Sequence, residues 1–223
     1  MTSLSDREIL LVGGAGGLGS ATAQLLESEG ARVVISSRHH GVHADITSAE
    51  DRKRMLDAVP NLFGLVVFAG TPARGETADA MRASFELNYE GPLLLAREAA
   101  ARMKGHGTPG AIVLFASMQA VALFPGSTAY AGAKAALAHA ARILAKEYRG
   151  PANIRVNVIA PGVMKAGMAE ASIASGKYDR YLADGIIPRW GEAADVARAV
   201  RFLLEPDNYI TGQVLSVDGG ITL

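Results

Sequence analysis

The chain has 223 residues, of which 49% are hydrophobic and 20% charged, and this globular composition excludes disorder and a fibrous repeat. Lys and Arg together number 22, as do Asp and Glu, so no net field draws the molecule onto nucleic acid or an anionic membrane. The absence of cysteine excludes disulfides and thiolate sites and fits a reducing compartment. We expect one domain over residues 1–223.

Membrane insertion and export are not expected. The N-terminus reads MTSLSDREILLVGG, which lacks the long apolar middle of a signal peptide. No charged residue occurs between Lys104 and Lys134, but prolines and polar residues interrupt that stretch. A cytoplasmic location is expected. Aromatic residues make up only 6% of the chain and no basic patch is evident, so nucleic-acid binding is not expected.

Short apolar runs alternate with segments of helical periodicity along the whole chain. Strands are predicted at residues 8–12, 32–35, 65–68, 111–116, 155–159 and 214–217, and helices at 18–29, 48–59, 80–103, 129–148 and 195–204. Continuous rather than alternating apolar strands indicate a parallel sheet buried on both faces. The fold class is therefore α/β, a doubly wound, Rossmann-like sheet with helices on both faces. Residues 163–190 are less regular, and we expect a flexible substrate lid there.

A glycine cluster lies between the first predicted strand and the first helix. Gly13, Gly16, Gly17 and Gly19 leave the backbone free of bulk where a pyrophosphate can approach, and the helix N-terminus after them supplies N–H donors. A plain turn is the alternative, but the flanking strand and helix favour a dinucleotide-binding loop.

The end of the second predicted strand bears on the choice of cofactor. An acidic residue at that place accepts the ribose hydroxyls of NAD, whereas an arginine accommodates the 2′-phosphate of NADP. Here the strand ends in Ser36, Ser37 and Arg38, without a carboxylate. A guanidinium can bind a phosphate bidentately, so NADPH is favoured over NAD. Arg38 as an ordinary solvated residue is the alternative.

Tyr130 and Lys134 are four residues apart in a predicted helix, so both side chains lie on one helical face. A nearby ammonium lowers the pKa of a phenol toward neutrality, which suits Tyr130 to general acid/base catalysis. Ser117 follows a predicted strand end, where its hydroxyl can polarise a carbonyl oxygen. A surface Tyr–Lys pair and a turn serine are the alternatives.

Taken together, these residues resemble the short-chain dehydrogenase/reductase family, from Glu8 to Gly220. The glycines resemble its TGxxxGxG loop, Ala69 and Gly70 the end of its NNAG motif, and the remaining matches are Asn88, Ser117, the YxxxK pair, Pro161 and Gly162. Four positions depart from the family pattern. Val12 replaces the leading threonine of the glycine loop, and Val67 and Phe68 replace the two asparagines of NNAG. Ala166 stands where the family often has a threonine that contacts the nicotinamide amide.

The resemblance implies a role for each matching residue. Ser117 would position the substrate carbonyl, Tyr130 would transfer the proton, Lys134 would also hold the nicotinamide ribose, and Asn88 would anchor a water in a proton relay. A helix amide bonded to nearby backbone is the alternative for Asn88. The candidate cofactor contacts are Gly13, Gly16, Gly17, Leu18, Gly19, Ser37, Arg38, Asp45, Ile46, Ala69, Gly70, Tyr130, Lys134, Pro161, Gly162 and Val163.

The segment from Arg38 to Asp45 is too short for the helix that adjoins the adenine in the family, so an open adenine end is expected. His39, His40 and His43 lie in this segment, and a solvated loop is favoured over a metal site. No metal is expected. As in the family, the long helices at 80–103 and 129–148 could form a homodimer or homotetramer.

A mostly apolar substrate pocket is expected over the nicotinamide, from Met118, Gln119, Phe124, Met164, Met168, Tyr178, Tyr181 and Trp190. The predicted function is the interconversion of a small carbonyl and a secondary alcohol. A regulatory protein that binds the dinucleotide without turnover is the principal alternative. An epimerase or dehydratase that uses the nicotinamide only transiently is a third.

Overall fold

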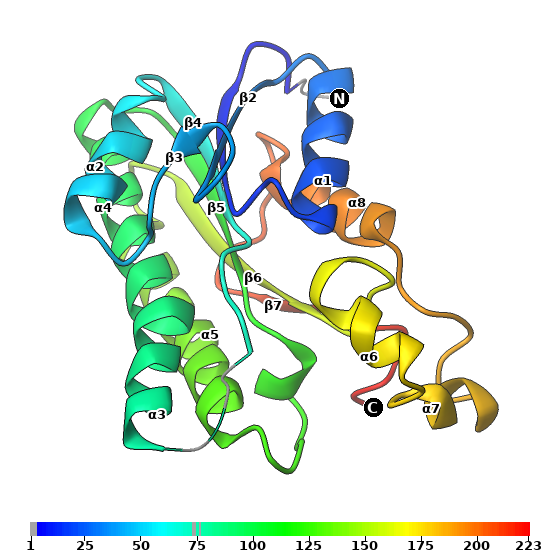
Figure 1. Cartoon of the computed structure of the whole chain (residues 1–223). Helices are drawn as coiled ribbons and strands as arrows, with labels where there is room; N and C mark the ends of the chain where they lie inside the picture. The colour runs from blue at the N-terminus through cyan, green and yellow to red at the C-terminus, as the bar shows by residue number, and fades with distance from the viewer. Residues whose placement is uncertain (1–3, 73–74, 76) are drawn as a thin grey trace.

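The computed structural model describes residues 4–72, 75 and 77–223, and it contains a seven-stranded parallel sheet in the order β3-β2-β1-β4-β5-β6-β7 (Figure 1). The strands are β1 Glu8–Val12, β2 Arg32–Ser37, β3 Val42–His43, β4 Leu62–Val67, β5 Gly110–Phe115, β6 Ile154–Pro161 and β7 Val214–Val217. Strand order reverses between β1 and β4, which makes the crevice at their carboxyl ends the expected ligand site.

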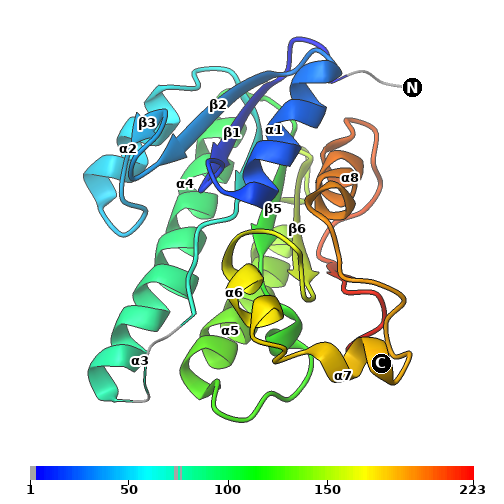
Figure 2. The same ribbon diagram turned by 45° about the vertical axis from the view of Figure 1, so that its right-hand side comes forward.

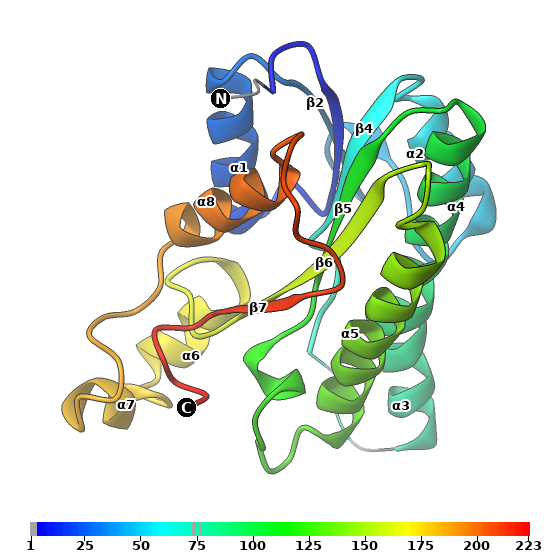
Figure 3. The same cartoon turned by 180° about the vertical axis from the view of Figure 1, so that it is seen from behind.

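Helices cover both faces of this sheet, as Figure 3 shows from behind. On one face lie α2 Ala49–Asp57, α4 Gly91–Gly105 and α5 Thr128–Tyr148, and on the other α1 Gly17–Ser28 and α8 Ala193–Leu204. The inner strands feed both cores, because successive side chains point to opposite faces. Thus Leu10 packs toward α4 and α5, while Ile9 and Leu11 pack toward α1 and α8. The doubly wound α/β fold predicted from the sequence is confirmed.

The helix predicted at 80–103 is interrupted by a π-helical turn. It consists of α3 Ala78–Phe85, the π turn η1 Glu86–Glu90 and α4, which follow one another almost in line (Figure 1). Pro92 in the first turn of α4 has no N–H to donate to the carbonyl of Asn88, which favours a break in the regular pattern here. The wider turn contains Asn88, one of the predicted catalytic residues.

Residues 163–190 contain short helices that the sequence analysis did not predict. They contain a 3-10 turn, η3 Gly167–Ala169, and two short helices, α6 Glu170–Ala174 and α7 Asp179–Ala183, which project beside the sheet in Figure 2. Val163, Tyr178 and Ile187 pack with Met118 and Ile221 in a small third core. Five-residue helices are too short to show apolar periodicity, which explains why the sequence did not predict them. Among the described helices, none is long and apolar enough to cross a membrane.

Candidate functional site

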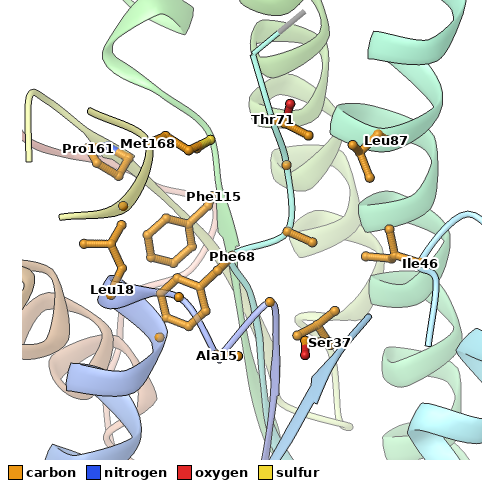
Figure 4. Close-up of a pocket in the computed structure, with 18 of the residues that line it drawn as sticks. Ala15, Leu18, Ser37, Ile46, Phe68, Thr71, Leu87, Phe115, Pro161 and Met168 are labelled. Carbon is orange, nitrogen blue, oxygen red and sulfur yellow. The ribbon is translucent and has the colours of Figure 1, made fainter. Parts of the chain in front are cut away.

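A cavity of about 740 Å³ opens at the carboxyl ends of the central strands. Its walls come from the segments that follow β1, β2, β4, β5 and β6, together with η1 and η3. Figure 4 shows Leu18 on one side of it, Ile46 and Leu87 on the other, and Phe68 and Phe115 between them. The cavity therefore lies where the order of the parallel strands reverses.

The glycine loop approaches its neighbours too closely for larger residues. A Cβ atom on Gly13, whose φ is +78°, would lie 2.8 Å from the backbone nitrogen of Ala69, and one on Gly19 would lie 2.4 Å from Cα of Gly14. Gly16 is the N-cap of α1 and offers no side chain to its first N–H groups. All five residues predicted here, Gly13, Gly16, Gly17, Leu18 and Gly19, line the cavity.

One end of the cavity is lined by the residues that follow β2 and β3. Ser37, Arg38, Asp45 and Ile46 all line it, as the sequence analysis expected. The Asp45 carboxylate accepts hydrogen bonds from Thr47, at 2.9 Å from the backbone nitrogen and 2.8 Å from the hydroxyl. These bonds lower the pKa of Asp45. Partial burial raises it, but by less, and the charge of Arg38 lowers it by a smaller amount.

Arg52 of α2 was not singled out in the sequence, yet it supports this end of the cavity. Its side chain is 5% exposed, and its Nη1 donates to the carbonyls of Ile46 and Thr47, both at 3.1 Å. Its Nε pairs with Glu98 of α4 at 3.1 Å. A charged residue in an amphipathic helix usually indicates a solvated position. Only the structure shows that this guanidinium ties the loop over the cavity to α4.

Ser117, Tyr130 and Lys134 meet at the floor of the cavity. Ser117 follows β5, and its hydroxyl accepts a hydrogen bond from the backbone nitrogen of Gln119 at 3.2 Å. Tyr130 and Lys134 lie on one face of α5, where they are 8% and 2% exposed. The Nζ of Lys134 donates to the carbonyl of Phe115 at 2.8 Å and lies 6.0 Å from the centre of the Tyr130 ring.

The electrostatics of this pair differ from the sequence-based expectation. Burial raises the pKa of Tyr130, and a hydrogen bond with Ser117 only partly opposes that effect. Burial also lowers the pKa of Lys134 to about 7. Desolvation disfavours the charged form of both groups. The pKa of Tyr130 is therefore raised by burial, whereas proximity to Lys134 predicted that it would be lowered.

Asn88 does not line the cavity but holds a segment that does. It is 1% exposed, its Oδ1 accepts from the backbone nitrogen of Thr71 at 3.0 Å, and its Nδ2 donates to the carbonyl of Thr71 at 2.9 Å. A Cβ on Gly70 would lie 2.7 Å from both Asn88 Oδ1 and Lys134 Nζ, so these two atoms approach the same point. The amide thus bonds to the backbone of a loop distant in sequence, not to the nearby backbone of the alternative interpretation.

Comparison with known proteins agrees with this geometry. The family model described as enoyl-(acyl carrier protein) reductase matches residues 36–222. Carbonyl reductase family member 4 of Danio rerio is 34% identical, over 98% of this chain and 99% of its own. The chain belongs to the short-chain dehydrogenase/reductase family. It is an NAD(P)-dependent oxidoreductase, which favours an enzyme over the non-catalytic alternative.

Solved structures of this family share its whole fold. A short-chain type dehydrogenase/reductase from Mycobacterium ulcerans has 30% sequence identity and a TM-score of 0.90, covering 99% of this chain and 91% of its own. The structure titled "ElxO with NADP Bound" has 26% identity and a TM-score of 0.86, covering 97% of this chain and 98% of its own. The single-domain Rossmann architecture is thus common to family members of similar length.

Among the departures from the family pattern, Val12, Phe68 and Ala166 line the cavity, and Val67 does not. Val12 and Val67 are buried in the core, so hydrophobic packing occupies the place of the family's polar side chains. Phe68 instead turns into the cavity, where its ring centre lies 4.4 Å from that of Phe115 (Figure 4). The backbone still pairs there, because the nitrogen of Phe68 donates to the carbonyl of Val12 at 2.8 Å. The sheet is braced without the asparagine side chains.

The remaining predicted contacts divide between the cavity and the third core. Ala69, Gly70, Pro161 and Gly162 line the cavity. Val163 does not: it is 4% exposed and packs in the third core, so its expected contact with the cofactor stays a prediction. Among the predicted substrate residues, Met164 and Met168 line the cavity, while Gln119 bonds with Ser127 and the others belong to the third core, namely Met118, Phe124, Tyr178, Tyr181 and Trp190.

The histidine-rich segment does not form a metal site in the part of the chain that the structure describes. No group of three His, Asp or Glu side chains gathers there closely enough to hold an ion. His39 and His40 instead line the cofactor cavity beside Arg38, whereas His43 lies outside it.

Proposed function

We propose that this enzyme interconverts a small carbonyl compound and a secondary alcohol with NADP(H) as its preferred cofactor, through Tyr130, Ser117, Lys134 and Asn88. The observation that carries this proposal is the meeting of Ser117, Tyr130 and Lys134 on the floor of a cavity whose opposite wall is the glycine loop. A hydroxyl, a proton donor and a cation are thereby presented to one bound molecule.

The residues of the cavity fit a dinucleotide. Gly13 and Gly19 let the loop pack closely against Ala69 and Gly14, and Gly16 and Gly17 line the cavity without side chains. The N-terminus of α1 favours an anion beside Gly16 and Gly17. NADPH, when bound, supplies the hydride for carbonyl reduction.

Each of the chain's own groups then has a task in proton transfer. The hydroxyl of Ser117 orients the substrate oxygen, and Tyr130 donates its phenolic proton to that oxygen in the reductive direction. The raised pKa of Tyr130 keeps this proton in place at neutral pH. Lys134 in its ammonium form stabilises the tyrosinate that remains. Asn88 holds Thr71 at the cavity edge by two hydrogen bonds. Gly70 lies between the side chains of Asn88 and Lys134.

The preference for NADP(H) over NAD(H) is supported by Arg38. Its exposed guanidinium lines the cavity at the end of β2, next to Ser37. Asp45 is the nearby carboxylate, and its Oδ1 is already engaged by Thr47. A 2′-phosphate would therefore meet a cation at the end of β2. NAD(H) is the alternative cofactor.

Residues 163–190 are proposed to form the substrate lid. Met168 and Ala169 line the cavity, and the chain then continues into the third core through Ile173 and Tyr178. A Cβ on Gly17 would lie 3.2 Å from Cβ of Ala166, so the lid approaches the glycine loop. These largely apolar surroundings favour a substrate with an apolar body.

Self-association is proposed through the face formed by α3 and α5. Phe85 and Met81 of α3 are 40% and 38% exposed, and Ile143 of α5 is 49% exposed. Exposed apolar side chains on neighbouring helices are typical of an interface. Light scattering coupled to gel filtration would test for a homodimer or homotetramer, and a monomer at all concentrations would contradict this proposal.

The activity is tested by following NADPH absorbance with a panel of ketones, quinones, aldehydes and sugars. We expect oxidation of NADPH with some of these carbonyls, and its loss in Tyr130→Phe and Lys134→Ala. Parent activity that survives Tyr130→Phe would contradict the assigned mechanism. For the cofactor, titration of NADPH and NADH into Arg38→Ala is expected to remove the preference for NADPH. An unchanged preference would exclude Arg38 from cofactor selection.

A further inference from the structure

Two histidines stand beside Arg38 at the adenosine end of the cavity. Arg38, His39 and His40 form the short connection between β2 and β3, and all three are exposed and line the cavity. Each can present hydrogen-bond donors to an anion, and a protonated imidazole also adds positive charge. The activity proposed above requires only the arginine, so the two imidazoles have no assigned role.

This connection is held in one conformation by the residues around it. The hydroxyl of Ser37 accepts from the backbone nitrogens of His39 and His40, at 3.3 and 2.8 Å, and donates to the carbonyl of His40 at 2.9 Å. Gly41 has a φ of +68°, and a Cβ there would lie 2.0 Å from the carbonyl oxygen of Ile35. The loop is therefore short and internally bonded, which fixes where its three side chains begin.

The acidic groups nearby are occupied elsewhere. Asp45 accepts from Thr47, while Asp51 accepts from the backbone nitrogen of Asp45 at 2.7 Å and pairs with Arg54 at 2.8 Å. Arg54 also donates to the carbonyl of His43. Glu86 of η1 lines the cavity as well. Within the described residues, no carboxylate forms an ion pair with Arg38, His39 or His40.

We propose that His39 and His40 join Arg38 in a phosphomonoester site that binds the 2′-phosphate of NADP(H) more tightly as the pH falls. The inference rests on the proposed preference for this cofactor. It adds that the preference depends on pH, because imidazole gains its charge in the physiological range whereas guanidinium is always charged.

The sign of this dependence follows from charge. A phosphomonoester loses its second proton near pH 6, so it is largely dianionic at neutral pH. A bound dianion favours protonated imidazole, so binding is accompanied by proton uptake. Affinity for NADP⁺ therefore rises as the pH is lowered. NAD⁺ lacks the 2′-phosphate, and its affinity lacks this rise.

The test is calorimetric titration with NADP⁺ and NAD⁺ at about pH 6.5 and about pH 8.5. The proteins are the parent, His39→Gln, His40→Gln and the double variant, with His43→Gln as the matched control because it lies outside the cavity. Exposed charged contacts contribute up to about 1 kcal/mol, so we expect the double variant to bind NADP⁺ about fivefold more weakly than the parent at the lower pH. Its affinity at the higher pH and its NAD⁺ affinity stay near parental values.

Proton uptake gives a second readout, obtained by repeating the titrations in buffers of different ionisation enthalpy. Titration of the 2′-phosphate itself is common to all the proteins, so the difference between parent and double variant isolates the imidazoles. Equal pH dependence and equal proton uptake in the two proteins would overturn the proposal. Failure of the proposed function is distinct: the parent would then bind NADP⁺ no more tightly than NAD⁺ at either pH, or would bind neither.

Discussion

The two ends of the cavity are built differently. At the catalytic end, Tyr130 and Lys134 are buried on a 21-residue helix, α5, and Asn88 is buried in the turn that packs against it. At the adenosine end, Arg38 and the neighbouring histidines are exposed on a short loop. Burial fixes geometry and shifts pKa values, whereas an exposed loop supplies charge that solvent screens. We therefore expect changes at the first end to alter the rate, and changes at the second to alter cofactor affinity.

The largest effect is expected for Lys134→Met. Without the ammonium, tyrosinate formation is no longer stabilised, and kcat is expected to fall about 10²- to 10³-fold. Steady-state oxidation of NADPH with a carbonyl substrate measures it. Lys146→Met, at an exposed position of the same helix, is the matched control and should retain parental kcat. If kcat of Lys134→Met stays within about fivefold of the parent, the Lys134 ammonium is not the charge that stabilises the tyrosinate.

A smaller loss is expected for Asn88→Ala. The two backbone groups of Thr71 lose their partners, which costs about 1–3 kcal/mol, and the cavity edge shifts. Thermal unfolding should show lower stability, and kcat should fall about tenfold to a hundredfold. Asn61→Ala, at an exposed position, serves as the control. Parental stability and kcat together in Asn88→Ala would mean that the bonds to Thr71 do not organise the site.

The pH dependence of kcat/KM sharpens the comparison further. The pKa of Lys134 is about 7, so its ammonium form is present below that pH and is lost as the pH rises. For reduction, kcat/KM for the carbonyl substrate is expected to fall about tenfold per pH unit above about 7. The double variant His39→Gln, His40→Gln should show the same fall above about pH 7, because these residues lie at the adenosine end of the cavity. A flat profile to about pH 9 would be incompatible with a required Lys134 ammonium.

The smallest effect is expected for Arg52→Met. Its guanidinium holds the carbonyls of Ile46 and Thr47, so its loss loosens the adenosine end alone. KM for NADPH should rise about fivefold with kcat unchanged, and Arg52→Lys should recover part of the loss. Lys53→Met, at the next and exposed position of α2, is the control. A fall in kcat at constant KM would show that the two ends are not independent.

The sequence predicted residues at both ends of the cavity, and what it missed at each end is the contacts that hold them. Apolar runs are sufficient to place buried strands such as β1 and β5, and the i, i+4 spacing of Tyr130 and Lys134 places them on one face once the helix is correct. The position of Asn88 followed from the family resemblance. The π turn that contains it did not, because its form depends on Pro92 and on packing against α5.

What was missed depends on contacts between distant segments. β3 has two residues, too few for any pattern, and exists because it pairs with Ser36 and Ser37. Arg52 has the character of a surface residue until Glu98 and the carbonyls of the preceding loop surround it. The pKa of Tyr130 is raised, whereas the sequence predicted that it would be lowered. The spacing shows the neighbouring charge of Lys134 but not the burial of the phenol.

We propose that Tyr130 transfers the proton while the rest of the cavity holds the cofactor. Single-turnover mixing tests it most directly: parent and Tyr130→Phe are loaded with NADPH, mixed with a carbonyl substrate, and followed by cofactor absorbance. We predict that Tyr130→Phe binds NADPH within about threefold of the parent and oxidises it at least about 10²-fold more slowly. Equal rates of oxidation in the two proteins would contradict the account.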